Sequence, residues 1–166
     1  CALDAISTIA KNVKSARVGA GTVCNKDQFK AVVQAGGEFV VSPGHSDELF
    51  AASYEYDIPL LPGAVTATEV MAVLNAGFPI IKFFPASTSG GAAAIKAFSG
   101  PFGNARFVPT GGIGPANLGE YLALPNVIAV GGSWVTPTNA VKQGQWDTVS
   151  QLAADAVALA NSLRAS

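Results

Sequence analysis

Lys82 lies within an apolar run at residues 78–85, an unusual setting for a lysine. The run predicts a buried strand, and burial disfavours the charged ammonium form, which lowers the pKa of the amine. A neutral amine on a rigid strand is a nucleophile, and its usual reaction is Schiff-base formation with a carbonyl compound. The alternative is a lysine near a strand end whose amine reaches water.

Two glycine pairs follow the last two predicted strands, Gly111-Gly112 and Gly131-Gly132. Glycines let the backbone approach an anion closely and point its N–H groups toward the charge. Many parallel barrels hold a phosphate group after their last strands. The two pairs therefore favour a phosphate site, and the alternative is that they only make tight turns.

Four further polar side chains lie near predicted strand or helix ends. Thr22 and Thr110 each follow a strand, where a hydroxyl can bind a substrate carboxylate or hydroxyl. Taken singly, each is better explained as a turn or cap residue. His45 has no evident partner and is more typical of a solvated loop than of a catalyst. Glu69 is explained by a helix capping box, so we do not expect it to be a general base.

Short apolar runs recur about every 20 to 26 residues, as buried parallel strands do. The six runs are residues 16–20, 39–42, 59–62, 80–84, 106–109 and 127–130. The first ten residues resemble the middle of an amphipathic helix, and later helices are expected to begin at Asn25, Ser46, Thr66, Pro115 and Asp147. Gly36 and Gly77 are expected to end two of them in the left-handed conformation.

The alternation of strands and helices predicts parallel βα units, and an open doubly wound sheet is the first alternative. A (β/α)8 TIM barrel is favoured because the unusual residues follow each strand, which is the active-site face of a barrel. The chain supplies about six of the eight units, so we interpret residues 1–166 as a single barrel domain that is incomplete at its N-terminal side. Phe84 and Trp134 are expected to form pocket walls or core, and Trp146 to pack near the last helix.

Composition excludes several classes of protein. Apolar residues make up 49% of the 166 residues, charged residues 13%, and the formal net charge is −1, with no basic patch for nucleic acid. No apolar stretch has the length of a membrane span, and no signal peptide is recognisable. Cys1 and Cys24, with a single histidine in the chain, have no metal-type spacing, so a reducing cytoplasm is expected.

Seven motifs, in this order and spacing, resemble the 2-keto-3-deoxy-6-phosphogluconate (KDPG) and 2-keto-4-hydroxyglutarate (KHG) aldolases. The resemblance runs from Cys1 to about Ala160. The motifs are VGAGTV at 18–23, SPG at 42–44, PLLPG at 59–63, KFFPA at 82–86, GPF at 100–102, PTGGI at 109–113 and GGSW at 131–134.

The resemblance implies a class I aldolase on a (β/α)8 barrel, assembled as a homotrimer, with neither metal nor other cofactor. Lys82 would form the Schiff base. Thr22 and Pro43 would line the pyruvyl side, Phe84 would pack against the pyruvyl group, and Thr110 would contact the substrate. The phosphate would be bound by Gly111, Gly112, Gly132 and Ser133.

Two departures from the family pattern stand out. Family members often have an acidic residue near Ser87, which this chain lacks. The family's first two strands and first helix are also absent, and with them a glutamate assigned as general acid/base and an arginine that binds the substrate carboxylate.

The expected activity is cleavage of 2-keto-3-deoxy-6-phosphogluconate to pyruvate and glyceraldehyde 3-phosphate, with 4-hydroxy-2-oxoglutarate as a second expected substrate. The alternatives are a 2-keto-3-deoxy-6-phosphogalactonate aldolase, a phosphate-binding barrel isomerase or lyase in which Lys82 forms only an ion pair, and an inactive barrel fragment. We expect no nucleic-acid or membrane partner.

Overall fold

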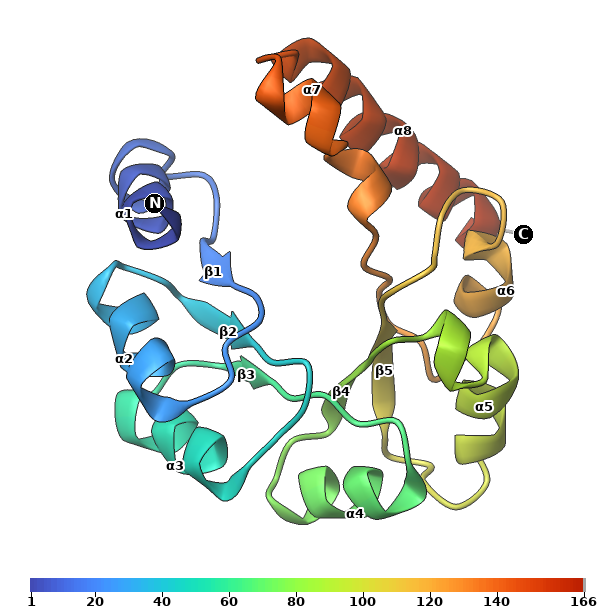
Figure 1. Cartoon of the computed structure of the whole chain (residues 1–166). Coiled ribbons are helices and arrows are strands. Elements are labelled where there is room, and N and C mark those ends of the chain that lie inside the picture. Colours follow the sequence, from blue (N-terminus) through green and yellow to red (C-terminus); the bar gives the residue numbers. More distant parts are fainter. Residues whose placement is uncertain (166) are drawn as a thin grey trace. The chain divides into compact units, whose positions relative to one another are not determined.

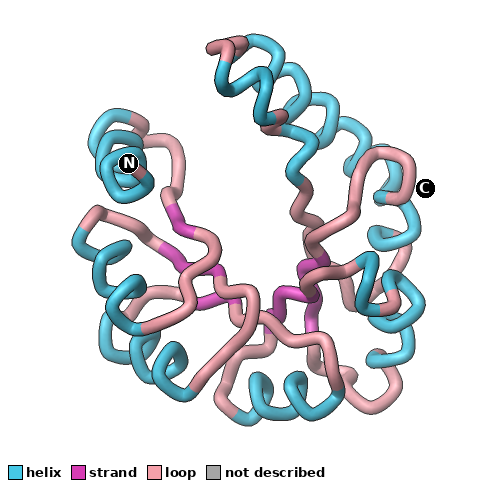
Figure 2. Tube along the Cα trace, in the orientation of Figure 1, coloured by secondary structure: helices cyan, strands magenta, loops and turns pink. Residues whose placement is uncertain are grey.

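The structure is a computed structural model that describes residues 1–165. The chain forms two compact units, Cys1–Lys82 and the residues from Phe83 onward, each of which contains helices and short strand structure (Figure 1). Along the first unit, short strands alternate with helices (Figure 2). Both strand pairs in the three-stranded sheet of the first unit are parallel, so the predicted α/β class with parallel strands is confirmed.

The first unit alternates four helices with four strands. Its elements are α1 (Ala2–Asn12), β1 (Gly19–Ala20), α2 (Lys26–Gln34), β2 (Phe39–Val41), α3 (Asp47–Tyr56), β3 (Leu60–Leu61), α4 (Ala67–Asn75) and β4 (Ile80–Phe83). The sheet order is β1-β2-β3, with Gly19 opposite Phe39 and Val40 opposite Leu60. β4 continues this series at the end of β3, where the Lys82 N–H donates to the Pro62 carbonyl.

The core of the first unit lies between its strands and the inner faces of α2, α3 and α4. Phe29, Val40, Val70, Val73 and Ile81 are all fully buried there. The helices turn one apolar face inward, as the sequence periodicity predicts for elements that flank a sheet. This packing fixes the strands whose carboxyl ends carry the candidate site.

The second unit contains one strand of its own and five helices of three turns or fewer before a long final helix. They are η1 (Ser87–Ser89), α5 (Gly91–Phe98), β5 (Arg106–Pro109), α6 (Leu118–Leu122), η2 (Ser133–Val135), α7 (Thr138–Lys142) and α8 (Trp146–Ala165). Directly after β5, the Thr110 N–H donates to the carbonyl of Phe83, the first residue of this unit. The core is aromatic: Phe107 packs edge-on against Phe83 and stacks with Phe98.

The sixth predicted strand, residues 127–130, is not a strand in the structure. It meets β5 through two isolated parallel bridges, Phe107↔Val127 and Thr110↔Gly131. Between these bridges β5 advances by three residues and its neighbour by four, so one residue bulges from the ladder. The other five predicted strands are present: β5 has the predicted bounds, and the remaining four are shorter than predicted.

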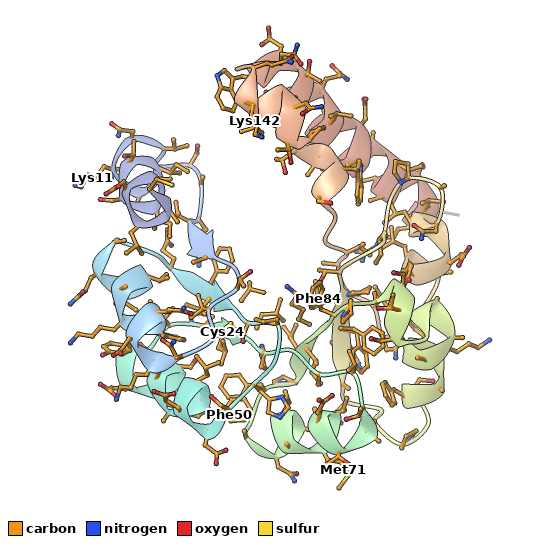
Figure 3. All side chains as sticks on the ribbon, in the orientation of Figure 1. Lys11, Cys24, Phe50, Met71, Phe84 and Lys142 are labelled. Atoms are coloured by element: carbon orange, nitrogen blue, oxygen red, sulfur yellow. The ribbon has the colours of Figure 1, made fainter. Side chains whose placement is uncertain are left out.

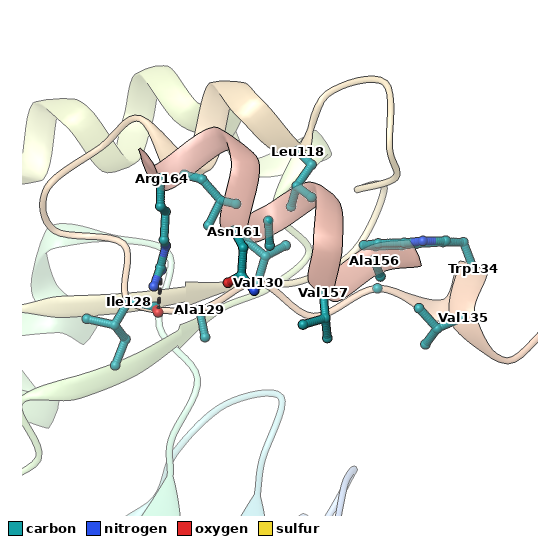
Figure 4. Close-up of a pocket in the computed structure, with 13 residues that line it drawn as sticks. Leu118, Ile128, Ala129, Val130, Trp134, Val135, Ala156, Val157, Asn161 and Arg164 are labelled. Carbon is teal, nitrogen blue, oxygen red and sulfur yellow. Dashed lines mark hydrogen bonds between the residues drawn. The ribbon is translucent and has the colours of Figure 1, made fainter. Parts of the chain in front are cut away.

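Pro109 contributes to this interruption. In a regular parallel ladder the Ile128 carbonyl would accept a hydrogen bond from residue 109, and proline has no N–H to donate. The Ile128 carbonyl instead accepts a hydrogen bond of 2.6 Å from the Arg164 guanidinium on α8 (Figure 4). The Arg164 side chain of the final helix thus takes the place of one backbone hydrogen bond of the parallel ladder.

Most helix starts follow the predicted caps. The side chains of Asn25, Ser46 and Thr66 each accept a hydrogen bond from the third residue of their helix, and Thr66 with Glu69 completes a capping box. Gly36 and Gly77 have φ values of 90° and 88°, as predicted for left-handed helix ends.

Two predicted helix starts are wrong. Pro115 lies in a turn, and α6 begins only at Leu118, because the Asn117 side chain bonds Gly112 and Gly114 and so holds the preceding residues in that turn. α8 begins at Trp146, so Asp147 lies inside its first turn. A carboxylate there favours the helix through the helix dipole rather than as a cap.

Candidate active site

Lys82 is the third residue of β4 and is half-buried between two fully buried neighbours, Ile81 and Phe83. Its backbone is fixed on both sides, because its N–H donates to Pro62 (2.8 Å) and its carbonyl accepts from Ala64 (3.0 Å). Desolvation by burial lowers the pKa of the amine. The structure therefore bears out the sequence expectation of a desolvated amine on a rigid strand.

The β2–α3 loop lies directly against the residue that pairs with Lys82. Gly63 forms a parallel bridge with Lys82, and its N–H donates to the Gly44 carbonyl at 2.8 Å. A Cβ on Gly63 would collide with the carbonyl of Pro43, so only glycine permits this approach. The carbonyl of Pro43, which is predicted to line the pyruvyl side, thus lies against Gly63, the bridge partner of Lys82.

Thr22 follows β1 with a backbone φ of 60°, in the left-handed region. A β-branched residue rarely adopts this conformation, and such outliers concentrate at functional sites. Its side chain is exposed, and its carbonyl accepts a weak hydrogen bond from the Cys24 thiol. The conformation is consistent with a functional role at this strand end, which the sequence indicated only weakly.

Thr110 directly follows β5, and folding withdraws its hydroxyl from water. Its Oγ1 is buried and, among residues 1–165, has no hydrogen-bond partner. A buried hydroxyl without a partner costs free energy, so it is a natural group to bind a ligand atom. The alternative from the sequence, a hydroxyl that caps a helix or forms a turn, is wrong for this side chain.

The Gly111-Gly112 turn needs glycine for its conformation, because φ is 96° and 73°. A Cβ on Gly112 would also collide with the Ser87 hydroxyl, and one on Gly111 would lie 3.2 Å from the Phe84 ring. Phe84 is 37% exposed, so it is not a core residue. The N–H groups of Gly111 and Gly112 donate to no acceptor in the described part of the chain, and they lie beside the Phe84 ring.

At the second pair, Gly131-Gly132, a larger residue would collide with neighbouring side chains. A Cβ on Gly131 would collide with the Thr110 methyl group, and one on Gly132 with the Trp134 ring. Ser133 is exposed and begins η2. Within the described part of the chain, the N–H groups of Gly111, Gly112 and Gly132 donate to no protein acceptor. Such open donors are what an anion site requires.

Trp134 is half-buried and lines a pocket of about 350 Å³ beside α8, so the expectation of a pocket wall is confirmed (Figure 4). The pocket is mostly apolar, with Val130, Val135 and Val157 among its walls and Arg164 at one end. Trp146 is the first residue of α8 and is 61% exposed, so it packs little.

His45 is the residue that sequence reasoning undervalued. It is half-buried rather than solvated, its ring stacks on Phe50, and its Nδ1 lies 2.9 Å from the Gly63 carbonyl. The partner is 18 residues away, so no local spacing could have indicated the contact.

Three further observations concern metal ligands, cysteines and membrane-spanning helices. Among residues 1–165, no three His, Cys, Asp or Glu side chains are grouped to hold a metal ion. Cys1 and Cys24 are both exposed and form no disulfide. Of the helices described, none combines the length and apolar character required to cross a bilayer.

Comparisons with known proteins identify the family of the chain. The family model "Aldolase: KDPG and KHG aldolase" matches residues 1–152. The KHG/KDPG aldolase of Escherichia coli K12 is 48% identical over 157 residues, which are 95% of this chain and 74% of that protein. The 2-dehydro-3-deoxy-phosphogluconate aldolase of Dickeya dadantii is 48% identical over 158 residues, with the same coverage.

Among solved structures, a KDPG aldolase from Legionella pneumophila was captured with pyruvate as a covalent carbinolamine intermediate. It is 43% identical, covers 91% of this chain and 73% of its own, and superposes with a TM-score of 0.88. A family model that spans most of the chain and relatives this similar establish the assignment. The chain belongs to the KDPG and KHG aldolase family.

Proposed function

We propose that this chain is a class I aldolase in which Lys82 forms a Schiff base with a 2-keto acid. The proposed substrate is 2-keto-3-deoxy-6-phosphogluconate, which is cleaved to pyruvate and glyceraldehyde 3-phosphate. The observation that carries the proposal is the half-buried Lys82 amine, whose pKa burial lowers, on a strand fixed by backbone hydrogen bonds. The relatives named for this substrate, from Dickeya dadantii among others, support the choice.

The reaction begins when the neutral Lys82 amine attacks the C2 carbonyl to give a carbinolamine, which loses water to form a protonated imine. The electron pair of the C3–C4 bond moves into the imine, leaving an enamine and releasing glyceraldehyde 3-phosphate. Protonation at C3 and addition of water then free pyruvate and the amine.

The proton of the C4 hydroxyl needs an acceptor. Glu69 is taken up by its helix cap, where its carboxylate accepts from the N–H groups of Val65 and Thr66. We assign the proton to a bound water or to a base outside these 166 residues.

The remaining residues take the roles that the resemblance gives them. Thr22 and Pro43 line the pyruvyl side, Phe84 packs against the pyruvyl group, and the buried Thr110 hydroxyl contacts the substrate. The open N–H groups of Gly111, Gly112 and Gly132, with the Ser133 hydroxyl, bind the phosphate. The support is the left-handed Thr22, the unpartnered Thr110 hydroxyl and the open donors.

We further propose that the βα units belong to a (β/α)8 barrel and that the protein is a cytoplasmic homotrimer. The parallel order β1-β2-β3 and the likeness to the Legionella enzyme support the barrel. A similar chain in a protein cage built by fusing symmetric oligomeric domains supports a symmetric assembly. Two unpaired, exposed cysteines are typical of a reducing compartment.

A second activity, cleavage of 4-hydroxy-2-oxoglutarate to pyruvate and glyoxylate, is favoured by the Escherichia coli relative, which is named for both substrates. That substrate has no phosphate. The two activities therefore differ in their need for the glycine turns of the second unit.

Borohydride trapping tests the proposal. Incubation with pyruvate and borohydride is expected to add one reduced pyruvyl group, and peptide mapping to place it on Lys82. Lys82→Arg is expected to abolish both adduct and turnover, because arginine stays protonated. Lys96→Arg, at an exposed lysine of α5, is the matched control and should react like the parent. Turnover by Lys82→Arg would overturn the mechanism.

Steady-state kinetics with the two substrates tests the phosphate assignment. Ser133→Ala is expected to raise KM about tenfold for the phosphorylated substrate, the loss typical of a hydrogen bond to a charged group, and to leave KM for hydroxyglutarate unchanged. Equal changes for both substrates would show that Ser133 does not bind phosphate.

A further inference from the structure

The turn that follows β3 is held at every backbone N–H group. The N–H of Gly63 donates to the Gly44 carbonyl, and that of Ala64 to the Lys82 carbonyl. The next two, of Val65 and Thr66, donate to the Glu69 carboxylate. Residues 63–66 therefore form a rigid frame against which Lys82 is placed.

One carbonyl of this frame is held by a side chain from another loop. The His45 Nδ1 lies 2.9 Å from the Gly63 carbonyl. Since a carbonyl only accepts, Nδ1 must carry the proton, in either the neutral or the charged ring. With the Gly63 N–H on the Gly44 carbonyl, this makes a two-point connection between the β2–α3 loop and Gly63.

The imidazole itself is held by a row of aromatic rings. It stacks on Phe50 at 5.6 Å between ring centroids, and Phe50, labelled in Figure 3, stacks on Phe78 at 5.0 Å. Tyr54 meets Phe78 at 5.5 Å and anchors its hydroxyl on the Ala76 carbonyl at 2.6 Å. The ring is therefore fixed on α3, and its Nδ1 is presented to Gly63 in one orientation.

Gly63 connects this arrangement with the reactive lysine. It bridges to Lys82 in the sheet, and its two neighbours, Pro62 and Ala64, make the hydrogen bonds that fix the Lys82 backbone. A shift of Gly63 would move these partners together and displace the base of the Lys82 side chain. Displacements of about 1 Å can cost as much as 100-fold in rate when geometry limits the reaction.

We propose that His45 is a positioning residue for imine formation: its Nδ1–H bond to the Gly63 carbonyl holds the strand end that sets the place of Lys82. This inference rests on the proposed Schiff-base function. His45 touches no substrate in this role and exchanges no proton with it.

Two substitutions separate the hydrogen bond from the ring stacking. His45→Phe keeps a ring on Phe50 but has no N–H for Gly63. His45→Asn loses the ring but can present an amide N–H from about the same position as Nδ1. Single-turnover trapping with pyruvate and borohydride measures the rate of imine formation in the whole chain, and thermal unfolding measures stability.

The expected result is that His45→Phe forms the imine about tenfold more slowly at unchanged melting temperature. His45→Asn should stay within about twofold of the parent rate, even if its melting temperature falls. A Phe variant that reacts as fast as the parent would overturn the proposal. So would equal slowing in both variants, because the ring and not the N–H would then matter.

The pH profile of trapping and the ¹⁵N chemical shifts of His45 distinguish a positioning role from acid–base catalysis. The pH profile of trapping should have the same shape in His45→Asn and in the parent; loss of a limb would make His45 an acid or base and refute a positioning role. The ¹⁵N shifts of the parent should show a protonated Nδ1, and a neutral ring protonated only on Nε2 would refute the bond without reference to activity. A parent chain that forms no adduct at all would instead refute the Schiff-base function.

Discussion

Two side chains of the candidate site, Lys82 and Thr110, carry polar groups that folding has withdrawn from water. The Lys82 amine is half-buried, and desolvation lowers its pKa. The Thr110 hydroxyl is buried without a partner among the described residues. Burial of either group costs folding free energy, and the Thr110 hydroxyl regains a hydrogen bond once a ligand supplies one.

The lowered pKa of Lys82 predicts how imine formation depends on pH. Only the neutral amine attacks pyruvate, so the trapping rate should rise with pH and level off with a midpoint below the ordinary value of 10.5. The folded chain binds this proton less tightly than the unfolded chain. The unfolding free energy should therefore also increase with pH from the folded pKa up to 10.5.

The trapping rate at a series of pH values, measured at saturating borohydride so that imine formation limits the rate, gives this midpoint. A lysine peptide treated in the same way is the reference. A midpoint at or above that of the peptide would contradict a desolvated amine.

Lys82 could be predicted from the sequence because its neighbours in the chain are also its neighbours in space. The apolar run of residues 78–85 describes its environment directly. His45 and Thr110 could not be predicted in this way. The first depends on Gly63, and the second on a burial that only the folded backbone defines.

At the scale of elements, the same distinction separates the successful predictions from the wrong ones. Helix starts at Asn25, Ser46 and Thr66 involve residues three apart, so the sequence contains all that the cap needs. The strand expected at residues 127–130 needs backbone hydrogen bonds from the neighbouring strand. Pro109, about 20 residues earlier in the chain, has no N–H to donate one of them.

The capping box at the start of α4 makes a prediction about stability. Glu69→Ala removes the acceptor of two backbone N–H groups, and the unfolding free energy at neutral pH should fall by about 1 kcal/mol. Those hydrogen bonds lower the pKa of Glu69 below 4.5. The contribution is therefore present above 4.5 and lost as the pH falls through the folded pKa.

Urea unfolding of the parent and Glu69→Ala at neutral and acidic pH measures this difference. Glu69→Gln keeps a neutral acceptor oxygen and should lie between the two at neutral pH. A difference that grows on acidification would contradict the sign of the lowered pKa.

At the scale of the whole molecule, one strand contributes to both cores. Ile81 is fully buried in the first unit and Phe83 in the second, and Lys82 lies between them in the chain. Side chains on a strand alternate between its two faces, so Lys82 projects to the face opposite that of Ile81 and Phe83. The position of the amine is thereby constrained by the packing of its neighbours on either side.

Composition and surface lead to a prediction about assembly. The formal net charge is only −1, so electrostatic repulsion between copies of the chain is weak. Exposed apolar residues, among them Leu3, Met71 and Val157, are available for contacts between copies. Sedimentation velocity at neutral pH should show a species of three times the 16.8 kDa chain mass. Its fraction should increase as the pH falls toward the pI near 5.7, because the net charge then vanishes.

A concentration series at pH 8 provides the comparison for this experiment. Only the 16.8 kDa species at every concentration and pH would contradict the trimer.

Residues 63–66 form a turn, but their amide hydrogens should exchange with deuterium as slowly as those of a strand. All four of their amide hydrogens are engaged, two by backbone carbonyls and two by one carboxylate. Exchange at these amides requires the frame around Lys82 to open, so their protection factors report how often the reactive amine loses its support. Deuterium uptake at this turn would thus follow the integrity of the active site in a protein with no substrate bound.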